Sequence, residues 1–212
     1  MRLVPITSEA PRPAAPLGIR PLEWADLKPK RILDFDIETI AAGFADPQWV
    51  PQKITCVAWS WVGQDVAHSR VCGPAGIFGN PERRARMLIP LLNAIAAADM
   101  VTGHNILRFD LRVLNAECMR LRLPVVSRVV VEDTMRLPRS TGFKKGQDVL
   151  GRLLRLEREK LALNWQEWQD AYDERGWPQV RERAESDVLM HKEIRAELKA
   201  LGYLKPPVEF RA

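Results

Sequence analysis

The chain has 212 residues and an apolar fraction of 46%, which fits one soluble domain with a substantial core. No stretch approaches the roughly 20 apolar residues of a membrane-spanning helix, and the first residues lack the apolar run of a signal peptide, so we expect a cytoplasmic location. The net charge of +5 is compatible with a polyanionic partner but is too small to indicate one. Three scattered cysteines argue against a disulfide framework and a zinc site.

Residues 1–30 contain six prolines, which exclude a regular helix or a central strand. We interpret this segment as an extended N-terminal arm and residues 31–212 as the main domain. A first strand is predicted at 31–38, where apolar and acidic side chains alternate between two faces. The apolar face holds Leu33, Phe35 and Ile37, and the acidic face holds Asp34, Asp36 and Glu38.

The rest of the chain predicts short strands and amphipathic helices in alternation. Strands are expected at 54–61, 66–72, 100–103 and 125–131, and helices at 81–98, 107–121, 147–156, 163–172 and 178–201. In the helix at 107–121 we assign Met119 to the core. This order predicts an α/β fold with a mixed five-stranded sheet, in which three antiparallel strands are followed by parallel additions and helices flank the sheet.

Four acidic residues stand where the chain otherwise reads as core: Asp36, Glu38, Asp110 and Asp187. Buried carboxylates are rare unless they are paired or hold a metal, and four together could not all stay ionised without a cation between them. The pattern therefore predicts a site for two Mg²⁺ or Mn²⁺ ions that cleaves phosphodiester bonds.

Each acid also has a simpler explanation when it is taken alone. Asp36 and Glu38 lie two apart on a strand, a spacing that is also typical of a solvated strand face. Asp110 begins a helix, where an acid suits the helix dipole. Asp187 lies on the apolar stripe of the last helix, where an ion pair with Arg183 or His191 would also satisfy it.

The combination is more specific than its members. Phe-Asp-Ile-Glu-Thr at 35–39, His-Asn-x-x-x-Phe-Asp at 104–110 and Glu-Ser-Asp-Val at 185–188 resemble, in order and spacing, the DEDD superfamily of 3′–5′ exonucleases. That superfamily includes polymerase proofreading domains and small stand-alone phage and bacterial exonucleases. The resemblance covers about residues 31–200.

The resemblance implies a ribonuclease H-like fold and removal of nucleotides from a 3′ end by two divalent ions. The implied ligands are Asp36, Glu38, Asp110 and Asp187. Asn105 and Phe109 match positions that support the second motif and its substrate contacts, while Thr39 and Ile40 would lie beside the terminal base. The implied partner is single-stranded nucleic acid, because a terminal base must be splayed into the pocket. DNA is favoured over RNA.

The third motif departs from the family pattern. The family places a tyrosine four residues, or a histidine five residues, before the last aspartate, and here these positions are Arg183 and Glu182. Glu182 could act as the base if the helix began or bent there, and Tyr172 or His191 could reach the site from elsewhere. Alternatively, Arg183 holds a phosphate or neutralises Asp187, and the chain is a weak or inactive nucleic-acid-binding module.

Two further features could contact nucleic acid. The segment 139–160 has seven basic against three acidic residues, including Lys144 and Lys145, and reads either as a phosphate-contacting surface or as a solvated helix face. Trp165, Trp168 and Trp177 could stack bases or serve packing.

Overall fold

A six-stranded mixed sheet lies at the centre of the structure, a computed structural model that describes residues 31–40, 53–73, 80–137, 146–164 and 177–212. The strands are β1 Ile32–Ile40, β2 Lys53–Trp61, β3 His68–Val71, β4 Met100–Gly103, β5 Arg128–Asp133 and β6 Val208–Arg211, arranged β3-β2-β1-β4-β5-β6. β1, β2 and β3 pair antiparallel, β4 and β5 add in parallel, and β6 pairs antiparallel with β5.

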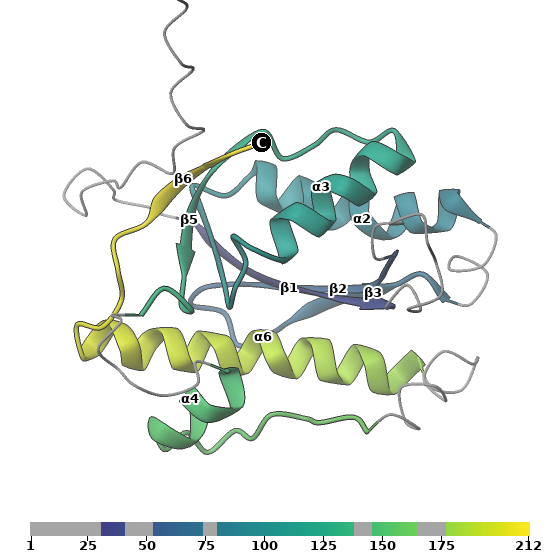
Figure 1. Cartoon of the computed structure of the whole chain (residues 1–212). Coiled ribbons are helices and arrows are strands. Elements are labelled where there is room, and N and C mark those ends of the chain that lie inside the picture. The colour runs from purple at the N-terminus through teal and green to yellow at the C-terminus, as the bar shows by residue number, and fades with distance from the viewer. Residues whose placement is uncertain (1–30, 41–52, 74–79, 138–145, 165–176) are drawn as a thin grey trace, which may run out of the picture.

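Helices cover both faces of this sheet (Figure 1). α2 (Pro81–Ala96) and α3 (Asp110–Leu121) lie on one face, and α6 (Trp177–Ala200) lies across the other with the short α4 (Gln147–Leu153) packed outside it. Asn80 begins α2, because its side chain accepts a hydrogen bond from the backbone N–H of Arg83 at 3.1 Å and satisfies a free donor of the first turn.

The alternation in β1 decides which layer each side chain enters. Leu33, Phe35 and Ile37 are buried in the main core under α2 and α3. The acidic face of the strand is turned towards α6, whose apolar stripe packs on β2. Since α6 covers this face, Asp34 is buried, and Asp36 and Glu38 are only partly exposed.

The α/β class, the mixed sheet and the flanking helices are confirmed, and this arrangement agrees with a ribonuclease H-like fold. Two predictions are wrong in detail. The sheet has a sixth strand, β6, and Met119 is 73% exposed, because it stands five residues after the buried Leu114 and so lies roughly 140° around the helix from it. All three cysteines are free and buried.

Some predictions lie outside the described residues. These are the N-terminal arm and most of the helix expected at 163–172. Within the described part of the chain, none of the helices combines the length and the apolar character needed to cross a bilayer.

Candidate metal centre

Three of the four predicted acids meet between β1 and α6. Asp36 and Glu38 project from the same face of β1, and Asp187 approaches from α6. One carboxylate oxygen from each of the three lies within 4.8 Å of the other two. Asp187 is buried, whereas Asp36 and Glu38 are partly exposed, so the cluster has an opening on the side of β1.

Asp110 joins the cluster from the opposite helix layer. It is the first residue of α3 and is buried, and its Oδ1 accepts a hydrogen bond from the backbone N–H of Ile37 at 3.2 Å. Ile37 lies between Asp36 and Glu38, so this bond attaches the start of α3 to the acidic segment of β1. Asp110 lies outside the group of three close oxygens, yet its charge acts on Asp36.

The electrostatics of the cluster favour a cation. Burial raises the pKa of Asp36 well above its usual range, and the charge of Asp110 raises it further. Burial also raises the pKa of Asp110, to about 7, against the opposing hydrogen bond from Ile37. The pKa of Glu38 is raised by burial and held back by Arg183. Carboxylates in this state bind either protons or a positive ion.

The donor set fits a hard divalent ion. Asp187 Oδ1 is buried and has no hydrogen-bond partner among the described residues, and one carboxylate oxygen of Asp187 lies within 4.8 Å of one oxygen each of Asp36 and Glu38. Carboxylate oxygens are the ligands that Mg²⁺ and Mn²⁺ take in proteins. We therefore regard Asp36, Glu38 and Asp187, with Asp110 beside them, as residues that could hold such ions.

Two basic side chains already contact the cluster. Arg183 Nε lies 2.9 Å from Glu38 Oε1, and one of its terminal nitrogens lies 3.5 Å from Asp187 Oδ2. Lys160 Nζ lies 2.9 Å from the same Asp187 oxygen and donates to Gln147 Oε1 at 3.0 Å. The predicted Arg183–Asp187 pair is present, and Lys160 is a second cation that sequence reasoning missed.

Other predicted site residues lie on β1 or in the segment that leads into α3. Thr39 follows Glu38 across a register shift in β1, and Ile40 ends the strand. Asn105 has a left-handed backbone with φ of 65°, and Phe109 packs against the main core directly before α3. Lys144 and Lys145 lie outside the described residues.

The candidates for a general base are not gathered at the cluster. Glu182 is exposed on α6, which begins at Trp177 and continues as helix past Glu182. The helix therefore does not begin at Glu182, which is one of the conditions under which this side chain would reach the cluster. Both ring nitrogens of the buried His191 are engaged by other side chains. Tyr172 lies outside the described residues.

Asp133 is a positioning residue that sequence reasoning missed. This buried residue ends β5, and its carboxylate accepts backbone N–H groups from Asn105 at 2.9 Å, Met135 at 2.9 Å and Leu107 at 3.2 Å. Two of these donors belong to the loop that leads into α3, so Asp133 fixes the approach to Asp110. The signal for Asp133 in the sequence was an acid at the end of an apolar strand.

Three of the remaining basic and aromatic candidates have structural partners. Arg152 pairs with Asp148 and Arg158 with Glu193, which favours a solvated ion-paired face for that part of 139–160. Trp177 is buried against the main core, so packing is its role. Trp165 and Trp168 lie outside the described residues.

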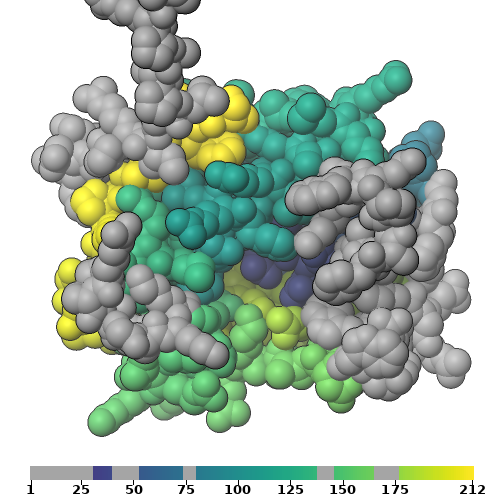
Figure 2. Space-filling view, viewed as in Figure 1, coloured from purple at the N-terminus to yellow at the C-terminus, as the bar shows by residue number. Residues whose placement is uncertain are grey.

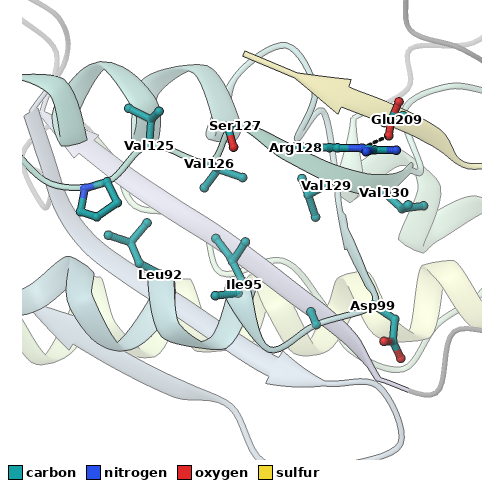
Figure 3. A pocket seen from close by; sticks show the side chains of 13 residues that line it. Leu92, Ile95, Asp99, Val125, Val126, Ser127, Arg128, Val129, Val130 and Glu209 are labelled. Carbon is teal, nitrogen blue, oxygen red and sulfur yellow. Dashed lines mark hydrogen bonds and ion pairs between the residues drawn. The ribbon is translucent and has the colours of Figure 1, made fainter.

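The space-filling view shows how the site is reached. Purple atoms of β1 lie at the bottom of a hollow bordered by teal and green segments (Figure 2). A separate cavity of about 470 Å³ lies between α2 and β5 and is mainly apolar, with the Arg128–Glu209 ion pair at its edge (Figure 3). None of the four acids lines this cavity, so the candidate metal centre lies outside it.

The raised pKa values predict that the metal-free protein becomes less stable as pH rises. Asp110 has a pKa of about 7 when folded against an ordinary 3.8, so the folded state binds more protons between these values, and the stability this proton confers is lost as pH passes 7. We expect a lower melting temperature in EDTA at pH 8 than at pH 5.5, with Mn²⁺ reversing the difference.

Thermal melts at the two pH values test this, with Asp110→Asn as the control that flattens the pH dependence. A metal-free protein that is equally stable at pH 5.5 and pH 8 would show that the acids are not held close together.

Comparison with known proteins supports the fold. No family model and no curated protein matches the chain. Among solved structures the chain is similar to the family B DNA polymerase from the hyperthermophilic archaeon Pyrobaculum calidifontis, with a TM-score of 0.53 and 17% identity over 81% of this chain and 24% of that chain. The chain thus spans about a quarter of the polymerase, and shares its α/β fold with that part of it.

Proposed function

We propose that this protein is a divalent-metal-dependent 3′–5′ exonuclease that hydrolyses phosphodiester bonds at single-stranded 3′ ends, with DNA favoured over RNA. The observation that carries the proposal is the convergence of Asp36, Glu38 and Asp187 within 4.8 Å beside the buried Asp110. The motif resemblance to polymerase proofreading domains supports it, as does a fold shared with part of a DNA polymerase. Residues 31–212 would form the catalytic domain, acting in the cytoplasm.

In this proposal the four acids hold two Mg²⁺ or Mn²⁺ ions. When bound, such ions supply Lewis-acid stabilisation of charge on the phosphate and on the attacking and leaving oxygens. The chain's own contribution is to hold the carboxylates in place from both helix layers. Thr39, Ile40, Asn105 and Phe109 would border the terminal nucleotide, and Lys144 and Lys145 would contact phosphates. Glu182 would act as the base only if α6 bent at that residue.

The substrate preference is tested with matched single-stranded DNA and RNA oligonucleotides of one sequence, together with a blunt DNA duplex. We expect the single-stranded DNA to be shortened fastest and the duplex slowest, because only an unpaired end can enter the site without the cost of unstacking. Faster digestion of RNA would overturn the DNA preference, and equal digestion of the duplex would overturn the single-strand preference.

A second function is favoured by the contacts of Arg183. Its bonds to Glu38 and Asp187 neutralise two of the carboxylates that would hold the ions. A protein with this arrangement could bind single-stranded nucleic acid without cleaving it. Loss of a general base typically costs about 10²- to 10⁴-fold in rate, so a nuclease without one would be slow. A slow nuclease and a pure binding module would both bind nucleic acid, so metal binding separates the two functions more clearly than nucleic-acid binding does.

Arg183 should therefore compete with metal. We expect Arg183→Gln to bind Mn²⁺ about tenfold or more tightly than the parent, because a hydrogen bond to a charged group contributes about 1.5 kcal/mol or more. Calorimetric titration of Mn²⁺ measures the change. Arg181→Gln, on an exposed position of the same helix, is the matched control for loss of one positive charge. Unchanged Mn²⁺ affinity in Arg183→Gln would show that Arg183 does not occupy the metal's place.

A further inference from the structure

A chain of buried side chains runs alongside the metal centre without including any of its four acids. Asp34 Oδ2 lies 2.6 Å from His191 Nδ1, and His191 Nε2 lies 2.9 Å from Thr134 Oγ1. Thr134 Oγ1 in turn lies 3.0 Å from Nδ1 of His104. Asp34, His191 and Thr134 are 1%, 2% and 0% exposed, so water does not interrupt their contacts.

The chain connects the same elements that carry the acids. Asp34 stands two residues before Asp36 on β1, and His191 stands four residues, about one helical turn, after Asp187 on α6. Thr134 follows β5, and His104 begins the loop that leads to α3. Each link therefore joins two segments whose relative position decides the geometry of the cluster.

These buried polar contacts by themselves add little to the stability of the fold. Asp34 is 1% exposed, and removal of a carboxylate from water is costly. Replacement of buried polar or ionic partners by apolar side chains of similar volume is often neutral or stabilising. A buried chain of hydrogen bonds can instead fix one relative position of the elements that it joins.

The hydrogen-bonding capacities agree with one direction along the chain. With Asp34 ionised and both rings neutral, the N–H of His191 donates to Asp34 and its other nitrogen accepts the proton of Thr134. The hydroxyl oxygen of Thr134 then accepts the Nδ1–H of His104. The Thr134 hydroxyl also lies 3.4 Å from the carbonyl oxygen of Gly103, and it contacts both imidazoles, so both ring orientations depend on Thr134.

We infer that the Asp34–His191–Thr134–His104 chain is a positioning device for the site. It fixes the rotation of α6 over β1, and hence the place of Asp187, together with the loop that carries Asn105. The part of this inference that concerns catalysis rests on the proposed exonuclease function.

The test removes the hydroxyl of Thr134 without changing the branched shape of the side chain. We expect Thr134→Val to lower kcat for 3′-end digestion and Mn²⁺ affinity each by about tenfold or more, as outer-shell substitutions do at metal sites, while KM stays within about threefold. Thr134→Ser, which keeps the hydroxyl, should restore both. The matched control is Thr102→Val on β4, because Thr102 is fully buried and its Oγ1 has no hydrogen-bond partner among the described residues.

A second variant separates positioning from stability. In Asp34→Leu/His191→Phe the buried pair becomes apolar, and we expect the melting temperature to hold or rise while Mn²⁺ affinity falls. The inference is overturned if Thr134→Val keeps kcat within twofold and binds Mn²⁺ like the parent, or if the double variant loses stability but keeps its Mn²⁺ affinity. If the parent shows no nuclease activity, the proposed function fails, and the Mn²⁺ affinities still decide this inference.

Discussion

Asp36→Ala should abolish metal-dependent digestion while leaving the fold intact. Asp36 lies at the centre of the acids, since the charges of Asp110, Glu38 and Asp187 all act on it. Metal ions contribute several kcal/mol of transition-state stabilisation, so their loss corresponds to a fall of about 10³-fold or more in rate. In EDTA the variant should melt at or above the parent temperature, because a buried like charge has been removed.

The measurement is the initial rate of digestion of a labelled single-stranded DNA in Mn²⁺, with circular dichroism to confirm the fold. Asp65→Ala is the matched control, because Asp65 is an exposed acid in the turn after β2. If Asp36→Ala digests the substrate as fast as the parent does, the site is misassigned.

Asp133→Asn is expected to damage both stability and activity although it replaces none of the four acids. The Asn side chain has one oxygen, so its amide N–H₂ would face the backbone N–H of Leu107, leaving a buried donor unsatisfied at a cost of about 1–3 kcal/mol. For a chain of this length that lowers the melting temperature by roughly 2–10 °C. Because the loop before Asp110 would shift, we also expect about 10²-fold slower digestion.

Asp148→Asn is the matched control, because Asp148 forms an exposed pair with Arg152 that contributes less than about 1 kcal/mol. Differential scanning calorimetry and the digestion assay together give the result. A variant that melts earlier but digests at the parent rate would restrict Asp133 to a structural role.

The elements with strong periodicity were predictable from the sequence. β1 and α2 follow the apolar spacing of a strand and of an amphipathic helix. β6 was missed because its pairing with β5 depends on a partner far away in sequence. The prediction for Met119 is wrong because a spacing of five residues from Leu114 does not keep it on the buried face of α3.

The acids of the site were predictable because carboxylates in apolar surroundings stand out. Apart from the Arg183–Asp187 pair, their partners were not predictable. Arg183 and Glu38 are 145 positions apart, and the Asp34–His191 pair spans 157 positions, so no local pattern indicates which charge meets which. His191 reads as one more residue of an amphipathic stripe until the fold places it against β1.

The most direct test of the account is incubation of the parent protein with a single-stranded DNA labelled at its 5′ end, in Mg²⁺, Mn²⁺ or EDTA. We predict a ladder that shortens from the 3′ end in either metal and an intact oligonucleotide in EDTA. That result would establish a 3′–5′ exonuclease that works with Arg183 in the place of the usual tyrosine. An oligonucleotide left intact in both metals, with a matching RNA also uncut, would contradict the account and leave a nucleic-acid-binding module.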